Sequence, residues 1–252
     1  MTAFHYDQIG EGYARRRQAE PRIAVQIEAA LGEAHSVINV GAGAGSYEPR
    51  DRLVVAVEPS RTMIAQRPPG AAPCVQASAE ALPAAHASFD AAMAVLTMHH
   101  WRDWPRGLHE MRRVARQRIV IVTFDASTSP FWLHDYFPQI AEMDRRTMPA
   151  LADMAAEIGQ FEAVPVEVPH DCCDGFLGAY WRRPEAYLDA KVRGAISCFA
   201  QFDASAGLRS LAHDLDSGAW RRKHAALLSR TSLDVGYRLL TWEYAPRPAD
   251  AR

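Results

Sequence analysis

The sequence predicts a doubly wound α/β fold, a seven-stranded mostly parallel sheet with helices on both faces and helical cap insertions. Three observations point to it. Short runs rich in β-branched residues alternate with segments whose apolar residues recur at helical spacing. A glycine-rich turn follows the first such run and an acidic residue ends the second, as in nucleotide-binding α/β units. A length of 252 residues with 48% hydrophobic residues suits a single domain over residues 1–252.

The first expected elements lie on either side of the glycine-rich turn. A helix begins at Pro21 and ends at Gly32, because proline suits a first helical turn and glycine the position after the last. Pro68 and Pro69 stop a second, short helix. In chain order the sequence indicates a helix over 21–31, strands over 37–40 and 53–57, a helix over 61–66, a short strand around Val75 and a strand over 89–96.

The second half of the chain continues the alternation. Its expected elements are a helix that starts at Pro105, a strand over 118–124, a helix over 151–158 and strands over 164–168 and 235–244. Two stretches are left over, residues 127–148 and 169–232, and the second is too long for an ordinary connection. We expect both to form helical cap elements for a substrate, beside a cofactor-binding core of residues 36–124.

Composition and charge narrow the class of protein. A net charge of −2 gives no global electrostatic footprint for nucleic acid. The chain opens without the pattern of a signal peptide and has no uninterrupted apolar stretch of membrane-spanning length, so we expect a cytoplasmic protein without a membrane partner. Four cysteines without a C-x-x-C array indicate reduced thiols and no metal site. We expect a monomer or a homodimer.

The segment over residues 37–60, VINVGAGAGSYEPRDRLVVAVEPS, carries the main functional signal. Gly41, Gly43 and Gly45 follow the pattern of a buried strand, and glycine lets the main chain approach a ligand with no Cβ in the way. Glu58 ends the next strand, where a carboxylate can accept hydrogen bonds from a ribose diol. A plain glycine turn is the alternative, but the glycines, their spacing and the acidic residue occur together.

The same segment disfavours a dinucleotide. A pyrophosphate favours G-x-G-x-x-G, whose third glycine lets a helix pack closely with its N-terminus toward the phosphates. Here the third glycine comes one residue early, and Ser46 stands where that fingerprint expects glycine. Pro49 and its charged neighbours leave room for little more than one helical turn. We therefore expect a ligand that contains adenosine but no phosphate.

The chain resembles class I S-adenosylmethionine-dependent methyltransferases of the small-molecule branch, methyltransferase type 11, related to the ubiquinone and menaquinone methyltransferases. The similar segments are VINVGAGAGSYE, VVAVEPSRTMI, VQASAEALPAAHASFDAAMAVLTMHHWRDW and LHEMRRVAR, which cover residues 36–124 in the family's order. The resemblance implies a Rossmann-like methyltransferase fold, S-adenosylmethionine as cofactor with S-adenosylhomocysteine as product, and a small-molecule methyl acceptor.

What the resemblance implies for the cofactor begins with the glycine turn. Gly41, Gly43 and Gly45 would pass under the methionine and the ribose of the cofactor. Glu58 would hold the ribose hydroxyls, and Met63 would pack on the adenine. These five positions match the family's motif in order and spacing.

Two later segments add further implied contacts. Ser78 and Ala79 in ASAEALP would face the edge of the adenine. Many relatives carry aspartate at the Ser78 position, so we expect a weaker contact to the adenine amino group here. Leu96 and Thr97, where the fourth strand ends, would lie beside the methionine end of the cofactor.

The opening of the chain resembles the N-terminal lid of the family, over residues 1–20. Tyr13 and Arg17 would then reach the cofactor carboxylate, and Tyr6 would contact the acceptor. The alternative is an N-terminal amphipathic helix that only packs on the domain.

Methyl transfer makes few demands on catalytic side chains. It is a single in-line displacement, so positioning and desolvation supply most of the rate, although a hydroxyl or an acidic carbon as acceptor benefits from a base. His99 and His100 follow the fourth strand and are the catalytic candidates, with His99 as base or substrate orienter. A structural corner whose imidazoles bind backbone groups is the alternative. Trp101 would wall the acceptor pocket.

The two leftover stretches supply the remaining substrate-binding candidates. The first contains Trp132 and Tyr136. The second contains HDCCDGFLGAYWRRPEAYLD, where Cys172, Tyr180 and Trp181 form a richer mixture than a plain helix needs. This segment resembles one found in part of the family, without an assigned reaction. The alternative is that these aromatic residues are only the core of a helical subdomain.

Other functions are weighed beside methyl transfer to a metabolite. The missing third glycine opposes a dinucleotide oxidoreductase. Methylation of arsenic or another thiophile needs a spaced thiol set that the cysteines do not form. Methylation of a nucleic-acid base favours an N/D-P-P-Y type turn and a basic face, where this chain has TMHH. A cofactor-binding protein without catalysis is an alternative of a different class.

Overall fold

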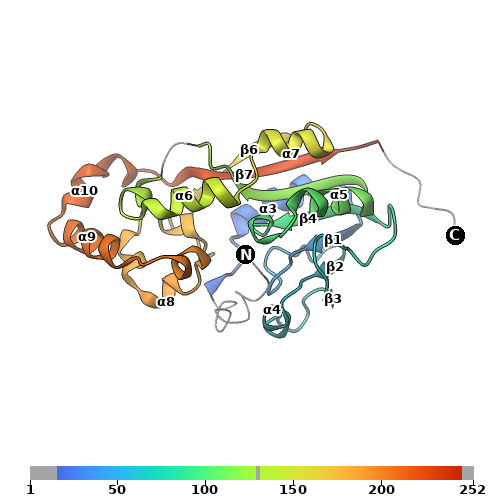
Figure 1. The fold of residues 1–252 in the computed structure, drawn as a ribbon, viewed down its shortest axis with the longest axis horizontal. Helices are drawn as coiled ribbons and strands as arrows, with labels where there is room; N and C mark the ends of the chain where they lie inside the picture. The colour runs from blue at the N-terminus through green and yellow to red at the C-terminus, as the bar shows by residue number, and fades with distance from the viewer. Residues whose placement is uncertain (1–15, 129–130, 246–252) are drawn as a thin grey trace.

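The computed structural model describes residues 16–128 and 131–245, and its centre is a seven-stranded sheet (Figure 1). The strand order is β3-β2-β1-β4-β5-β7-β6. Strand β7 runs antiparallel to both of its neighbours, and the other pairings are parallel. The strands are β1 (Ser36–Val40), β2 (Leu53–Val57), β3 (Cys74–Val75), β4 (Phe89–Val95), β5 (Ala115–Phe124), β6 (Glu162–Pro169) and β7 (Ser232–Glu243). The predicted fold class is confirmed.

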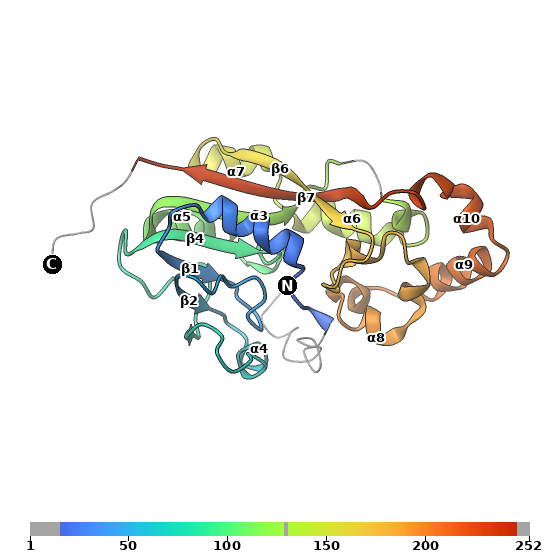
Figure 2. The ribbon, with the colours of Figure 1, turned by 180° about the vertical axis from the view of Figure 1, so that it is seen from behind.

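Helices cover both faces of the sheet because its central strands are apolar on both sides. In β4, Met93 packs on one face and Ala92 on the other, and in β5 the same holds for Val120 and Ile119. Figure 1 shows α5 (Trp104–Val114) in front of the strands, and Figure 2, from behind, shows α3 (Pro21–Leu31) in front of them. Helix α7 (Leu151–Ile158) packs on the same face as α5 through Met154. This double layer explains the unbroken apolar strand sequences.

Local signals set the ends of these helices. Pro21 begins α3, the Glu20 side chain accepts from the backbone of Arg22, and Gly32 ends the helix at φ +51°. Asp103 caps α5 in the same way. Strand β5 starts three residues earlier than predicted, because the chain leaves α5 directly into the sheet and Ala115 pairs with Phe89.

The two predicted insertions lie together at one end of the molecule, on the left in Figure 1 and on the right in Figure 2. They contact each other through Tyr136 Oη, which donates to Asp214 at 2.7 Å, and through Lys223 Nζ, 2.8 Å from Asp135. We call this assembly the cap. Its elements are η2 (Trp132–Asp135), α6 (Pro138–Thr147), η3 (Leu177–Tyr180), η4 (Pro184–Leu188), α8 (Ala190–Arg193), η5 (Ser197–Gln201), α9 (Ser205–Asp216), α10 (Ala219–Lys223) and η6 (Ala225–Leu227).

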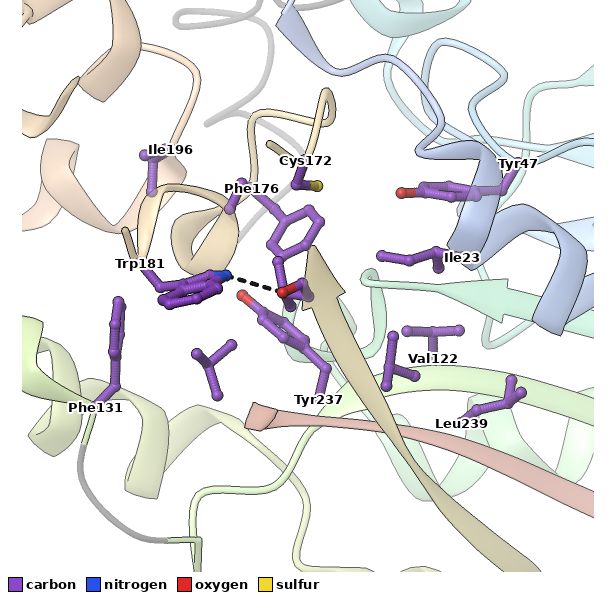
Figure 3. Close-up of a cluster of buried hydrophobic side chains, with 14 of the residues drawn as sticks. Ile23, Tyr47, Val122, Phe131, Cys172, Phe176, Trp181, Ile196, Tyr237 and Leu239 are labelled. Atoms are coloured by element: carbon purple, nitrogen blue, oxygen red, sulfur yellow. Dashed lines mark hydrogen bonds between the residues drawn. The ribbon is translucent and has the colours of Figure 1, made fainter. Parts of the chain in front are cut away.

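One apolar core joins the cap to the sheet. Figure 3 shows Trp181 and Phe131 of the cap beside Tyr237 of β7, with Val122 of β5 in the same cluster. The dashed line in that figure is the bond from Trp181 Nε1 to the carbonyl of Val168, at 2.8 Å. The cap is therefore anchored on the sheet through β6 and β7. Within the two described ranges, no helix is long and apolar enough to cross a membrane.

Candidate functional site

A cavity of about 340 Å³ opens where strands β1, β2 and β4 end. In parallel sheets the carboxyl ends of neighbouring strands lie at one edge, which is where ligands bind. Many of the residues implied by the resemblance line this cavity, namely Arg17, Gly41, Gly43, Glu58, Met63, Ser78, Ala79, Leu96, Thr97, His100 and Trp101. Segments far apart in sequence thus meet at the predicted position.

The glycine turn forms the floor of this cavity. Gly41 has φ +70°, and a Cβ at this position would lie 2.2 Å from Thr97 Oγ1. Gly43 has φ +52°, and a Cβ there would lie 3.3 Å from Met63 Cε. Both positions therefore require glycine on steric and conformational grounds. Gly45 lies outside the cavity wall, over Arg67, so the predicted direct contact of this third glycine is corrected.

Glu58 holds the turn in place. Its Oε2 accepts from the amide of Gly43 at 2.8 Å, and its Oε1 accepts from the amide of Ser60 at 2.9 Å. The side chain is only 6% exposed and lines the cavity. A carboxylate has acceptor positions for about four hydrogen bonds, so bracing the turn and accepting a ribose diol are compatible roles.

A buried ion pair that the sequence reasoning missed supports the turn from below. Arg67 Nη2 lies 2.7 Å from Glu48 Oε1, and both side chains are buried. Arg67 also donates to the carbonyl of Gly43, and Glu48 accepts from the amide of Ala72. The pair stabilises a turn that has no helix behind it. The signal available in the sequence was a lone arginine directly before two prolines.

Ser78 and Ala79, which the resemblance assigns to the adenine edge, line the cavity together with Trp101. Trp101 packs against Gly107, where an added Cβ would lie 2.6 Å from the indole, so α5 needs glycine at this position. Trp101, predicted to wall the acceptor pocket, therefore lines this first cavity and not the second.

A second cavity, of about 90 Å³, lies between the end of the sheet and the cap. Arg17 and Leu96 stand in the walls of both cavities, so the two adjoin at these residues. The other lining residues are His99, Thr123, Phe124, Met143, Asp144, Thr147, Met148, Phe176, Leu177, Ala195, Ile196, Ser197, Cys198, Gln201 and Tyr237. Most of this wall comes from the cap, as a substrate compartment requires.

The two histidines are divided between the cavities. They lie on η1 (Met98–His100), with ring centroids 3.8 Å apart, and His99 lines the second cavity whereas His100 lines the first. Burial, together with the nearby cation Arg17, lowers the pKa of His99 to about 4. His99 is therefore neutral near pH 7, which suits an acceptor of hydrogen bonds better than a strong base.

Arg17 is tied to the cap by a buried carboxylate. Its Nε lies 2.6 Å from Oδ1 of Asp174, whose residue is 0% exposed, and Tyr47 donates to the other oxygen at 2.8 Å. The carbonyl of Arg17 accepts from Ser46 Oγ at 2.8 Å. We call this set the clamp. It gives Ser46 a structural role in place of the missing glycine, and it explains the HDCCDG segment, whose function the sequence did not reveal.

The remaining lid prediction lies outside the described residues. Tyr6, Tyr13 and residues 1–15 of the lid are not described by the structure. Residues 16–20 run between the glycine turn and the cap, where the carbonyl of Arg16 accepts from the amide of Gly175 at 2.9 Å.

The aromatic substrate candidates of the cap lie in its core. The Trp132 indole donates to the carbonyl of Trp181, Trp181 is 0% exposed, and Tyr136 donates to Asp214. Cys172 is buried beside the clamp, and Tyr180 packs under the guanidinium of Arg183. None of the predicted Trp132, Tyr136, Cys172, Tyr180 and Trp181 lines either described cavity. In the described structure these side chains pack within the cap core, and their contact with an acceptor stays a prediction.

Comparison with known proteins agrees with this geometry. A family model described as a methyltransferase domain matches residues 38–122. The chain is similar to the structure of a proposed methyltransferase from an antibiotic biosynthesis pathway of Anabaena variabilis, with 33% identity over 90% of this chain and 98% of that one and a TM-score of 0.83. Among curated proteins, no sequence matches the chain.

Two more distant structures share the fold. One is a SAM-dependent methyltransferase of Thermotoga maritima, described as a possible histamine N-methyltransferase, with 22% identity over 66% of this chain and 84% of that one and a TM-score of 0.54. The other is the YcgJ protein of Bacillus subtilis, with 17% identity over 88% of this chain and 97% of that one and a TM-score of 0.51.

Proposed function

The chain belongs to the class I S-adenosylmethionine-dependent methyltransferases, and from this premise we propose that it methylates a small organic metabolite held under the cap. S-adenosylmethionine supplies an electrophilic methyl group on a sulfonium centre. The chain has to hold the acceptor in line with that group and exclude water, since positioning supplies most of the rate.

The observation that carries this proposal is the pair of adjoining cavities. The larger contains the residues that the resemblance assigns to the cofactor, at the sheet edge, and the smaller is lined mostly by the cap. Leu96 stands between them at φ +52°, a conformation that side chains rarely adopt, and its amide donates to Val122. Strained residues that the surrounding structure holds in place occur at functional sites. The strained backbone of Leu96 thus supports the proposal that methyl transfer takes place at the junction of the two cavities.

The size and chemistry of the second cavity support a small acceptor. Its wall combines apolar and aromatic side chains with a few polar ones, which is typical of small-molecule sites. A net charge of −2 supports a metabolite over a nucleic acid. The similar protein of Anabaena variabilis is placed in antibiotic biosynthesis, and we extend this to propose an acceptor from specialised metabolism.

In this reaction His99 orients the acceptor. Its neutral imidazole faces the second cavity, where one ring nitrogen can accept a hydrogen bond from an acceptor group. His100 lies on the cofactor side and belongs to cofactor binding in this proposal. We also propose a cytoplasmic monomer or homodimer, which the free thiols of Cys74, Cys172, Cys173 and Cys198 support.

The test is transfer of a labelled methyl group from S-adenosylmethionine into a panel of phenols, amines, thiols and activated carbons, with mass spectrometry of the products. We expect one small-molecule class to be labelled. Labelling of RNA or DNA in place of every small molecule would contradict the proposal. Tight cofactor binding without any transfer would instead favour the alternative of a cofactor-binding protein.

A further inference from the structure

Asp144 is a buried carboxylate that the methyl-transfer proposal does not use. It lies on α6 and lines the second cavity together with Met143 and Thr147. The residue is only 8% exposed. A charged side chain on the wall of a small internal cavity, among methionines and aromatic rings, is an unusual choice for packing alone.

The carboxylate of Asp144 has no partner among the residues that the structure describes. No ion pair or hydrogen bond offsets its burial, which raises its pKa to about 7. A buried carboxylate costs folding free energy unless a proton or a cation accompanies it. Carboxylates left in this condition at a cavity wall are frequent at functional sites.

The other polar groups of the cavity also favour a ligand that donates hydrogen bonds. The neutral imidazole of His99 has one acceptor nitrogen, and the hydroxyl of Thr123 can accept at the end of β5. The hydroxyl of Thr147 donates to the carbonyl of Met143 at 3.0 Å, so toward any further partner its oxygen can only accept. The described wall thus offers acceptors around Asp144, beside the hydroxyl and amide donors of Ser197, Gln201 and Tyr237.

The charges that face Asp144 come from several elements. Arg17 is in the wall, but its guanidinium is paired with Asp174. Burial raises the pKa values of the Cys198 thiol on η5 and the Tyr237 hydroxyl on β7, so both are neutral. His99 on η1 is neutral as well. The charge of the cavity therefore depends on whether Asp144 is ionised, and a cationic ligand would favour its ionised form.

From this arrangement, and resting on the proposed methyl transfer, we propose that the second cavity binds a protonated amine of the methyl acceptor with Asp144 as its counter-ion. An ammonium brings a positive charge and three donors, which match the carboxylate and the acceptors around it. The rings of Phe176 and Tyr237 in the wall also attract a cation. A neutral hydroxyl brings no positive charge, and a proton on Asp144 would then have to neutralise the carboxylate.

The ammonium is an anchor and not the methylated atom, because a protonated nitrogen has no lone pair for the displacement. Asp144 is accordingly a specificity-determining residue. The atom that receives the methyl group lies on another part of the acceptor, toward Leu96, which the two cavities share.

Binding of simple amines tests the proposal directly. The probes are methylammonium, butylammonium, benzylammonium and phenethylammonium chlorides, each beside its matched alcohol, titrated calorimetrically into the protein saturated with S-adenosylhomocysteine. We expect at least one amine to bind at least tenfold more tightly than its alcohol. Asp144→Asn should remove this preference, and Glu142→Gln, an exposed acid on the same helix, should retain it. An unchanged affinity for S-adenosylmethionine shows that each variant is folded.

The outcomes separate this proposal from methyl transfer itself. If no amine in the panel binds better than its alcohol, or if Asp144→Asn binds amines as the wild type does, the amine site is overturned. Amine binding that depends on Asp144, without labelled transfer into any acceptor, would support the site and contradict the methyl-transfer proposal. Transfer to neutral acceptors with an unchanged KM in Asp144→Asn would retain the reaction and reject the amine.

Discussion

The two cavities, one at the sheet edge and one beside the cap, are built in different ways. On the cofactor side, Gly41, Gly43 and Glu58 lie at the ends of adjacent strands, and backbone amides join them. The wall of the second cavity instead combines residues as far apart in sequence as Arg17 and Tyr237. A site at strand ends follows from local sequence, whereas a cap site depends on tertiary packing. Substitutions should therefore affect cofactor affinity on one side and acceptor handling or stability on the other.

The largest effect is expected at the clamp between the two regions. Asp174→Ala leaves the guanidinium of Arg17 and the hydroxyl of Tyr47 without their buried partner, which should lower the free energy of unfolding by about 3–5 kcal/mol. Tyr47→Phe, the matched control, removes one hydrogen bond and should cost about 1–2 kcal/mol. Urea unfolding measures both. Equal losses in the two variants would show that the clamp does not join the regions.

Asp144→Asn should instead raise the free energy of unfolding, by an amount that depends on pH. The folded pKa of about 7 exceeds the ordinary aspartate pKa of 3.8, so the folded state binds the proton more tightly, and stability falls as pH rises between these values. The variant lacks this loss and should be more stable than the wild type at pH 8 by on the order of 2–4 kcal/mol. At pH 4 the difference should nearly vanish. Thermal unfolding across this range checks it, and a difference independent of pH would exclude a buried ionising carboxyl.

Glu58→Ala should lower the affinity for the cofactor and leave the binding of the acceptor unchanged. The amides of Gly43 and Ser60 lose a charged acceptor, and the ribose loses its partner, so affinity for S-adenosylmethionine should fall by about 2–3 kcal/mol, roughly 30- to 150-fold. Glu58→Gln should retain part of the affinity. Calorimetry gives the values, and an unchanged affinity in Glu58→Ala would contradict the ribose assignment.

His99 and His100 allow a finer comparison of the two cavities, because each lines a different one. His99→Ala should lower turnover by about tenfold with cofactor affinity nearly unchanged, because its ring faces the second cavity. His100→Ala should mainly change cofactor affinity. Steady-state kinetics with calorimetry separates the two effects. The same loss in both variants would show that η1 acts as a structural corner.

The smallest effect is expected at the exposed thiol of the cap loop. Cys173→Ser should change the free energy of unfolding by less than about 0.5 kcal/mol and leave cofactor affinity intact, since the residue is exposed and a serine hydroxyl can replace the thiol in its contacts with the carbonyl of Ala19 and with Glu20. Thermal unfolding and calorimetry check this. Loss of cofactor binding would indicate a role of this thiol in the site.

The sequence predicted the sheet and the cofactor cavity well because their signals are local. The ends of α3 follow from Pro21 and Gly32, and the glycine turn and Glu58 are adjacent to their strands. Strand β7 begins at Ser232, earlier than predicted, because its polar first residues pair with β6 rather than bury an apolar face. Pairing with a distant strand is not visible in the strand's own sequence.

The acceptor side was harder to predict for the same reason. Asp144 escaped notice because residues 127–148 were expected to form a helical cap element without the bounds of a helix, so its place on the wall beside Met143 could not be seen. Trp132 and Trp181 stood out as aromatic residues, yet their N–H groups bind backbone carbonyls within the core. Composition indicates that a cap contains aromatic residues, whereas only tertiary structure shows which of them face a ligand.

The clamp has a thermodynamic consequence for the order in which ligands act. Asp174 of the cap binds both Arg17, which borders the two cavities, and Tyr47, which follows the glycine turn. A ligand that binds in one cavity and stabilises this contact also favours the binding of a ligand in the other cavity. Such coupling is reciprocal. If bound cofactor raises acceptor affinity by some factor, bound acceptor raises cofactor affinity by that same factor. S-adenosylhomocysteine would then dissociate more readily once the methylated product has left the second cavity.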